Sequence, residues 1–230
     1  MSTDNDFEIP NQVPVMTLRG VVLFPKAMMP LRIFEERYRL MLDDVLDGNR
    51  MFAIVAERED VSPEQEDLEL PFEVATVGLI RVSKKHDDGT SFVLLQGIDR
   101  VKIVSISKEE PYRVIEVKPW KTKVDEVISP VRERLTYALL RNRELGGEVT
   151  DEMLEFLKPL EDDVSFVDLT IYSLCKHTLR KQAMLEVQSL SKRGEMILQD
   201  IDRENKRLTL LKEVLGSADD EPPVLSLIHI

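Results

Sequence analysis

The pattern of apolar and polar residues divides the chain into two parts near residue 120. In the first part, short apolar runs are separated by turn residues, as in β-strands; in the second, apolar residues recur every three or four positions, as on helices. The predicted strands cover residues 13–18, 51–56, 74–82, 90–96, 101–104 and 112–117. Several short strands at this spacing predict a barrel or a sandwich, so the fold class is α+β.

The clearest turn in the first part is a predicted hairpin at Asp88-Gly89, between the strands 74–82 and 90–96. An Asp-Gly pair between two apolar runs favours a tight turn, because glycine adopts positive φ at little cost. Gly97 follows the second strand and permits a kink or bulge before the chain continues at Val101.

One helix interrupts the strands. Its apolar residues fall at helical spacing, with charged residues between them: Phe34, Tyr38, Met41, Leu42 and Val45. Gly48 is expected to end this helix as a left-handed cap. Further along, residues 57–71 are rich in Glu, Asp and Pro and predict an acidic surface loop.

Helical periodicity predicts five helices beyond Pro119. They cover residues 131–142, 153–160, 165–176, 179–188 and 192–215. Ser165 is expected to be the N-cap of the third, with Asp168 in the capping-box position. Gly216 is expected to end the long last helix, which can pack on its own bundle or on a second copy, so the oligomeric state stays open.

These patterns define four segments: a disordered tail at 1–12, a β subdomain at 13–119, a helical subdomain at 120–216, and a tail at 217–230. Residues 1–11 are acidic and lack a signal-peptide pattern, which predicts a cytoplasmic location. Residues 224–230 are abruptly apolar. Since an added strand, a docking peptide or a join in sequence assembly would each give this pattern, we treat 217–230 as disordered or artefactual.

Composition narrows the function classes further. The formal net charge of −12 repels phosphate backbones, so nucleic-acid binding is not expected. No run approaches the roughly 20 apolar residues of a membrane span. The single cysteine, Cys175, excludes an internal disulfide and a cysteine-based zinc site, and three histidines make a histidine metal cluster improbable. No metal and no cofactor are therefore expected.

The possible catalytic groups have simpler structural explanations. Cys175 and His177 are two residues apart on a predicted helix and point to different faces, so a nucleophile–base pair is not expected. His86 lies in the hairpin turn, where a solvated side chain is favoured over a metal ligand. Trp120 is expected to pack where the two subdomains meet.

Five short pieces of the sequence, in order, resemble the substrate-binding region of Lon proteases. The pieces are VPVMTLR at 13–19, VLFP at 22–25, PL and FEERY at 30–38, DGT with QGIDRV at 88–101, and KQ with LE at 181–186. The similarity covers roughly residues 13–212. Lys26 departs from it, because the family usually has glycine after this proline, which puts the local turn geometry in question.

The resemblance implies a PUA-like β-barrel packed on a helical bundle, with a role in binding unfolded or tagged polypeptides. The residues expected to maintain the family structure are Pro25, Pro30, Phe34, Glu35, Arg37, Tyr38, Gly89 and Gly97. Phe34 and Tyr38 should anchor the helix on the barrel, and Arg37 should form a structural ion pair.

The predicted binding residues are apolar groups near turns, namely Leu23, Phe24, Met28 and Met29. Methionine adapts to varied partners, which suits a surface that binds many sequences, although all four residues also suit a barrel core. The implied partners are polypeptide substrates, or a protease or chaperone that uses this chain to hold them.

The motifs of catalysis are missing from the sequence. A phosphate-binding loop needs Gly-x-x-x-x-Gly-Lys-Ser/Thr, and no glycine here is followed by lysine. The nearest match to a Lon peptidase serine motif is Gly216-Ser217-Ala218 at a helix end. We therefore expect a non-catalytic, stand-alone binding module. The alternatives are a PUA-like module for RNA or a small ligand, a hydrolase with an unrecognised site, and a fragment of a longer Lon protease.

Overall fold

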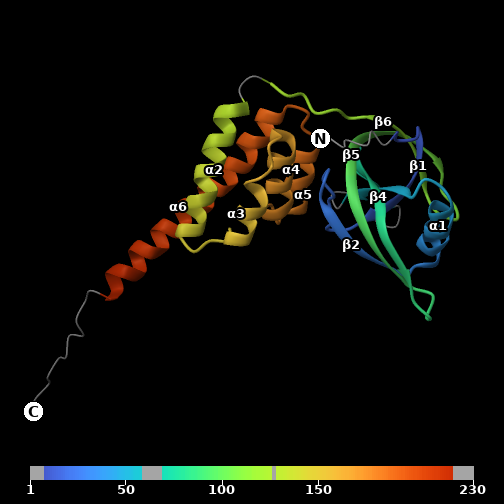
Figure 1. The fold of residues 1–230 in the computed structure, drawn as a ribbon, viewed down its shortest axis with the longest axis horizontal. Helices are drawn as coiled ribbons and strands as arrows, with labels where there is room; N and C mark the ends of the chain where they lie inside the picture. The colour runs from blue at the N-terminus through green and yellow to red at the C-terminus, as the bar shows by residue number, and fades with distance from the viewer. Residues whose placement is uncertain (1–7, 59–68, 126–127, 220–230) are drawn as a thin grey trace, which may run out of the picture.

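The computed structural model describes residues 8–58, 69–125 and 128–219. A β-barrel with one helix stands beside a bundle of helices, and an extended segment after β6 joins them (Figure 1). The predicted α+β class, with a barrel before a bundle that ends in a long helix, is confirmed. The predicted tails fall largely outside the described residues, at 1–7 and 220–230.

Six strands form one sheet, and five of them close into a ring. The strands are β1 (Gln12–Leu18), β2 (Met28–Ile33), β3 (Met51–Ala56), β4 (Val74–Lys85), β5 (Ser91–Lys108) and β6 (Val114–Pro119). Their order is β2-β5-β4-β3-β1-β6, and an additional β5–β6 pairing closes the barrel. β1 and β3 are parallel and the other pairs antiparallel. β2 pairs with β5 outside the ring and is therefore an edge strand.

β5 is long enough to serve both ends of the sheet. Its first half pairs with β2 and β4, and its second half with β6. The predicted hairpin joins β4 to β5, with Gly89 at φ +80°. The register shifts between Val77 and Gly78, where Ile98 has no partner opposite it, so the predicted irregularity after Gly97 is present as a bulge.

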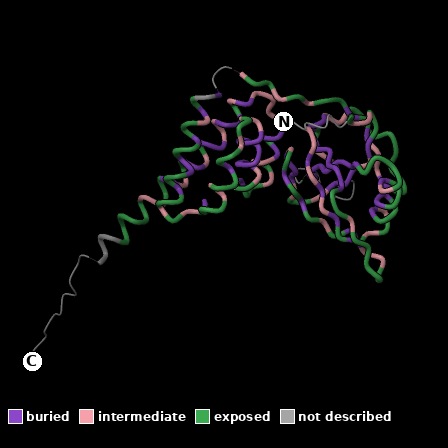
Figure 2. The backbone as a smooth tube through the Cα atoms, in the orientation of Figure 1, coloured by how far each residue is buried: buried purple, intermediate pink, exposed green. Residues whose placement is uncertain are grey.

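Two apolar clusters use alternate residues of the strands. One contains only strand residues and neighbours, such as Val15, Ala53, Val77 and Ile115. The other joins the opposite strand faces to the helices and includes Phe24. This second cluster is continuous from the barrel into the bundle, so the two parts share a core. Figure 2 shows buried residues in both parts.

Helix α1 (Glu36–Asp47) lies on the barrel and buries Tyr38, Met41, Leu42 and Val45. Phe34 does not anchor it as predicted: it precedes the helix, and its side chain is 62% exposed. The predicted left-handed cap at Gly48 is also wrong, since Gly48 has φ −109° and the chain turns two residues later, at Arg50 with φ 63°.

The bundle contains α2 (Ile128–Glu144), α3 (Asp151–Leu157), α4 (Asp163–Leu174), α5 (Thr178–Glu186) and α6 (Leu190–Asp219). Asp162, rather than Ser165, is the N-cap of α4, and its carboxylate accepts from the Ser165 amide. The helix begins earlier than predicted because Asp162 already supplies the capping oxygen. α6 also continues past Gly216, because a single glycine weakens a helix by only about 1 kcal/mol.

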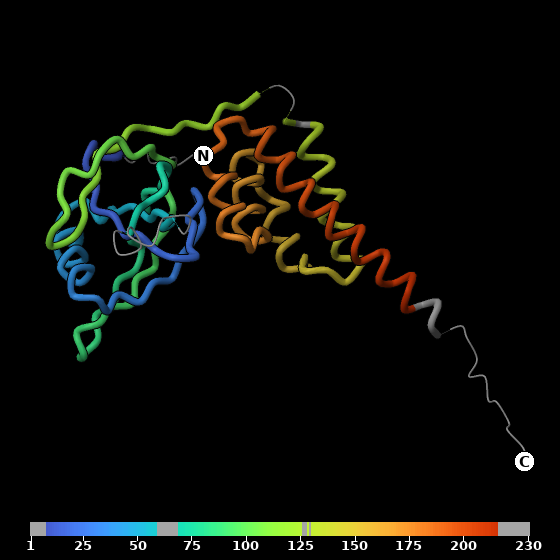
Figure 3. Tube along the Cα trace, turned by 180° about the vertical axis from the view of Figure 1, so that it is seen from behind, coloured from blue at the N-terminus to red at the C-terminus, as the bar shows by residue number. Residues whose placement is uncertain are grey.

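α2 and α6 pack side by side and run in the same direction. Arg134 pairs with Glu195 near their starts, and Asn142 hydrogen-bonds to Asn205 further along. The last turns of α6 extend beyond the other helices, as the view from behind shows (Figure 3). Leu211 and Leu215 are exposed there, whereas Ile197 and Ile201, earlier on the same helix, are buried.

Candidate polypeptide-binding surface

The structure separates the four predicted binding residues. Leu23, Phe24 and Met29 are buried in the core that joins barrel and bundle, with exposed fractions of 1%, 0% and 7%. Met28 is 39% exposed. The first three cannot contact a partner while the protein is folded, so a binding role stays a prediction for Met28 alone.

A tight turn places Met28 at the start of β2. The Ala27 amide donates to the Phe24 carbonyl (3.2 Å), with Pro25 as the second residue and Lys26 as the third, at φ 66°. Proline second and a left-handed residue third define a type II turn. This geometry explains why glycine suits the position that Lys26 occupies.

Gly97 on β5 forms two hydrogen bonds with this turn. Its carbonyl accepts from the Lys26 amide (2.8 Å), and its own amide donates to the Ala27 carbonyl (2.9 Å). A Cβ at Gly97 would lie 2.1 Å from the Phe24 oxygen. Pro25 and Gly97, both predicted as structural residues, therefore meet in the fold.

The outer face of β2 and its neighbours carries an apolar surface. Met28 and Pro30 lie opposite Gln96 and Leu94 of β5, and Val82 of β4 lies opposite Leu94 on the other side. We define the β2 surface as Met28, Pro30, Val82, Phe92 and Leu94. Met28, Val82 and Phe92 are 39%, 48% and 41% exposed, and Pro30 is exposed as well. The cations Arg32 and Lys84 lie opposite Phe92 at its end.

The free edge of β2 adjoins the β2 surface. In an antiparallel ladder, alternate residues direct both backbone groups to the partner strand. Because the Ala27 carbonyl is bonded to Gly97, the backbone groups of Met29, Leu31 and Ile33 also face β5. Those of Met28, Pro30 and Arg32 face away from it.

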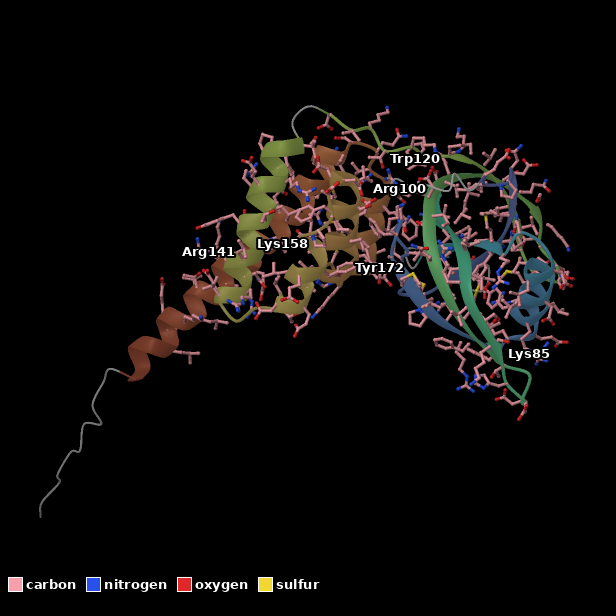
Figure 4. All side chains as sticks on the ribbon, viewed as in Figure 1. Lys85, Arg100, Trp120, Arg141, Lys158 and Tyr172 are labelled. Atoms are coloured by element: carbon pink, nitrogen blue, oxygen red, sulfur yellow. The ribbon has the colours of Figure 1, made fainter. Side chains whose placement is uncertain are left out.

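The bundle contacts this edge at Tyr172. The Tyr172 hydroxyl, from α4, donates to the Met28 carbonyl (3.2 Å). Figure 4 shows Tyr172 on the side of the bundle that faces β2. Among the residues that the structure describes, it is the one hydrogen-bond partner of the free β2 edge outside the sheet, and it fixes the edge relative to α4.

A buried arginine fixes the position of the bundle on the barrel. Arg100 of β5 is 1% exposed and donates to the carbonyls of Leu185 (2.7 Å) and Val187 (2.9 Å), at the end of α5. Its other terminal nitrogen donates to Thr122 Oγ1 (2.5 Å). Burial lowers the pKa of Arg100 to about 10, with a further contribution from Arg193. The predicted packing role of Trp120 fits this junction, where its Nε1 donates to the Glu186 carbonyl (2.8 Å).

A second buried arginine lies behind the first. Arg193 of α6 donates to the Val187 carbonyl (2.9 Å), and its Nη2 lies 2.9 Å from Asp168 Oδ1 of α4. Both side chains are almost completely buried, at 0% and 1% exposure. Asp168, predicted as part of a cap, is instead the buried anion of the junction. Sequence periodicity missed these residues, since Arg100 and Arg193 resemble surface arginines in the sequence.

The family-like run on α1 forms the predicted ion pair. Arg37 donates through both terminal nitrogens to Glu69 (2.7 and 2.8 Å) and through Nε to Glu35 (3.0 Å). Bonding to Glu69 raises the pKa of Arg37, and the same bond lowers the pKa of Glu69. These groups hold the start of α1 against the segment before β4, so their role is structural.

A hollow lies on the bundle, with a volume of about 920 Å³. Its lining includes Val149, Leu174, Cys175 and Ile197. Its charged rim is internally neutralised, because Lys176 pairs with Glu148 and Arg180 with Asp200. Burial raises the pKa of the Cys175 thiol, which makes it a poorer nucleophile. The β2 surface is the better candidate, since Met28, Pro30, Val82, Phe92 and Leu94 are all apolar.

Metal and membrane sites receive no support from the described residues. Those residues contain no group of three or more His, Cys, Asp or Glu side chains arranged to hold a metal ion. Within the same ranges, no helix has both the length and the apolarity needed to cross a membrane. His86 is exposed in its turn, and most of the acidic loop, at 59–68, lies outside the described ranges.

Comparison with known families assigns most of the chain. The family model for the substrate-binding domain of ATP-dependent protease La (LON) matches residues 12–203. Curated relatives include a Lon protease of Trichlorobacter lovleyi, 24% identical over 95% of this chain, and Lon protease 2 of Desulfotalea psychrophila, 27% identical over 83%. The chain spans about a quarter of these relatives, 27% and 25% of their lengths.

Solved structures share the fold. The N-terminal domain of the Mycobacterium avium complex Lon protease superposes with a TM-score of 0.63 at 18% identity, over 83% of this chain and 97% of that one. A Lon N-terminal domain protein from Xanthomonas campestris gives 0.62 at 20% identity, over 82% and 97%. The matched region corresponds to the substrate-binding part of Lon proteases and not to their ATPase or peptidase modules.

Proposed function

Since this chain belongs to the Lon substrate-binding domain family, we propose that it binds unfolded or client polypeptides through the β2 surface and has no catalytic role itself. The observation that carries the proposal is the cluster of exposed apolar side chains around Met28, on a rigid sheet next to a free strand edge. A contiguous exposed apolar patch is a usual sign of a protein-binding site.

The surroundings of the surface support this choice. β2 is held by the ladder to β5, by the turn at Gly97 and by the Tyr172 hydroxyl, so the apolar residues are positioned before a partner arrives. Preorganisation lowers the entropy cost of binding. The polypeptide is passed to a protease or chaperone that supplies ATP hydrolysis or peptide cleavage, and we place this activity in the cytoplasm.

The test is a binding titration with a permanently unfolded protein. Fluorescein-labelled lactalbumin, reduced and carboxymethylated, is titrated with the chain, and native lactalbumin serves as the folded control. We expect binding of the unfolded form alone, retained in 1 M NaCl, because apolar contacts survive the salt that screens charges. Loss of the bound signal with rising salt would point instead to a charged partner such as RNA.

A matched pair of variants locates the site. Phe92→Lys places a charge on the β2 surface, and Phe156→Lys places the same charge at a phenylalanine of α3 that is 53% exposed. We expect Phe92→Lys to weaken binding at least about tenfold, as for a buried contact residue, and Phe156→Lys to leave it unchanged. Equal effects of the two variants, or no binding by the wild type, would contradict the proposal.

A further inference from the structure

The free edge of β2 offers a backbone that is ready to pair. The N–H groups of Met28 and Arg32 and the carbonyls of Met28, Pro30 and Arg32 face away from β5. Within the described ranges, Tyr172 alone bonds to this edge, at the Met28 carbonyl. Unpaired groups on an edge strand are a template for another extended chain.

We propose that the polypeptide binds as an additional strand on β2, with its backbone paired to Arg32 and Pro30 and its alternate side chains beside Met28 and Pro30. This inference rests on the proposed function and specifies its mode of recognition. Backbone pairing supplies affinity that is independent of sequence, and the apolar face adds a preference for alternating apolar residues. Such binding selects unfolded chains, because a folded protein seldom presents a free extended backbone.

The edge favours a peptide over a second copy of this chain. If two β2 strands paired about a two-fold axis through their centres, Pro30 would lie opposite Pro30, and neither residue could donate an N–H. Each copy would also carry a net charge of −12. A peptide without proline at that position supplies the donor that the Pro30 carbonyl lacks.

Backbone methylation of the ligand is the first test. The probe is a fluorescein-labelled ten-residue peptide of alternating leucine and threonine with a lysine at each end, made in versions with a single N-methyl group at successive positions. Methylation removes one donor and leaves the side chain unchanged. We expect affinity to fall up to about tenfold at every second position and little at the positions between, because each lost hydrogen bond is worth about that factor.

Two substitutions at Arg32 test the same donor from the protein side. Arg32→Pro removes the outward N–H, whereas Arg32→Ala removes the side chain and keeps that N–H. Neither change touches the bonds from β2 to β5, and urea unfolding checks that both variants are folded. We expect Arg32→Pro to bind the peptide about tenfold more weakly than Arg32→Ala.

A third substitution adds a backbone N–H donor, so that one of the expected results is a gain in peptide affinity. Pro30→Val keeps an apolar side chain and supplies a new outward N–H, and we expect it to bind the peptide several-fold more tightly. A dimer of Pro30→Val in light scattering without tighter peptide binding would overturn the proposal in favour of self-pairing.

The results separate this inference from the proposed function. A flat methylation series, or equal binding by the two Arg32 variants, would overturn strand addition even if Phe92→Lys still abolished binding of unfolded lactalbumin. In that case the side chains alone would bind the polypeptide. Absence of binding to both probes by the wild type would overturn both proposals.

Discussion

Lys26 has a left-handed backbone, and its amide donates to the Gly97 carbonyl at 2.8 Å. The pair fixes the path of the chain into β2. Glycine suits the two positions for different reasons. At position 26 the backbone angle favours glycine, and at position 97 the lack of space for a side chain requires it.

Replacement of Lys26 by glycine should stabilise the protein. A non-glycine residue at φ 66° is strained by about 1 kcal/mol, and glycine removes that strain at some cost in unfolded-state entropy. We expect Lys26→Gly to raise the free energy of unfolding by about 0.5–1 kcal/mol in urea titrations. The control is Lys84→Gly, within β4, which should lower it by a similar amount; a loss at both sites would mean that the Lys26 turn is not strained.

Gly97→Ala should be far more damaging than its size implies. The added carbon would lie 2.1 Å from the Phe24 carbonyl oxygen, which is backbone and cannot rotate aside. We expect a loss of about 3 kcal/mol or more, as for severe overpacking. Gly89→Ala is the comparison, since its new carbon would meet only the Arg39 side chain and a positive φ, at about 1 kcal/mol. Equal losses in chemical unfolding would show that the turn can move away from β5.

Two of the predicted binding residues should respond in opposite ways. Leu23→Ala removes a buried side chain and should lower the stability by about 2–4 kcal/mol, while the folded fraction still binds unfolded lactalbumin normally. Met28→Lys should leave the unfolding midpoint nearly unchanged and weaken binding. Unfolding curves and fluorescence anisotropy titrations on the same samples distinguish the two effects. Weaker binding by folded Leu23→Ala would mean that Leu23 contributes to binding although it is buried.

Removing one member of the buried Arg193–Asp168 ion pair should destabilise the protein more than removing both members. Arg193→Met leaves Asp168 buried without its partner, which should cost about 3–5 kcal/mol. The double variant with Asp168→Leu removes both charges and should recover part of that loss. Urea unfolding measures the cycle, and Trp120, the one tryptophan of the chain, reports it by fluorescence. Additive losses would mean that the two charges do not interact.

Alkaline pH should destabilise the protein through Tyr112. Burial and the hydrogen bond to Asp44 (2.6 Å) raise the pKa of Tyr112 to about 12, against 10 for the unfolded chain. A tyrosine with a raised folded pKa contributes stability that is complete below pH 10 and is lost as the pH rises through 12. Tyr112→Phe should therefore flatten the decline in unfolding free energy between pH 10 and 12. Absorbance at 295 nm would contradict this if Tyr112 titrated near pH 10, as in the unfolded chain.

The sequence predicted the elements that depend on local patterns. Period-two runs located most strands, and Asp88-Gly89 located the hairpin, because both signals arise from neighbours in the chain. Arg37 was identified as an ion-pair residue, but its main partner, Glu69, lies 32 residues away and was not predicted. β2 itself was missed, since the proline residues at 25 and 30 interrupt its apolar run.

The binding site required the structure for a different reason. Leu23, Phe24, Met28 and Met29 have the same apolar character in the sequence, and their burial differs only because β2 alternates its faces from Met28 onward. Arg100, Asp168 and Arg193 were missed because burial of a charge depends on which elements meet around it. The residues in contact there are up to 87 positions apart in the sequence, whereas periodicity reports only on residues close together in the chain.

The closure of the barrel has a consequence for synthesis. β1 pairs with β6, so Gln12 meets Glu116, and more than a hundred residues must leave the ribosome before the ring can close. Until then, β1 and the second half of β5 lack their β6 partner and present open edges to neighbouring nascent chains. A protein that we propose binds extended polypeptides is thus itself an extended chain with unpaired strands early in its synthesis. Slower translation before Pro119 lengthens the time for which those strands are exposed.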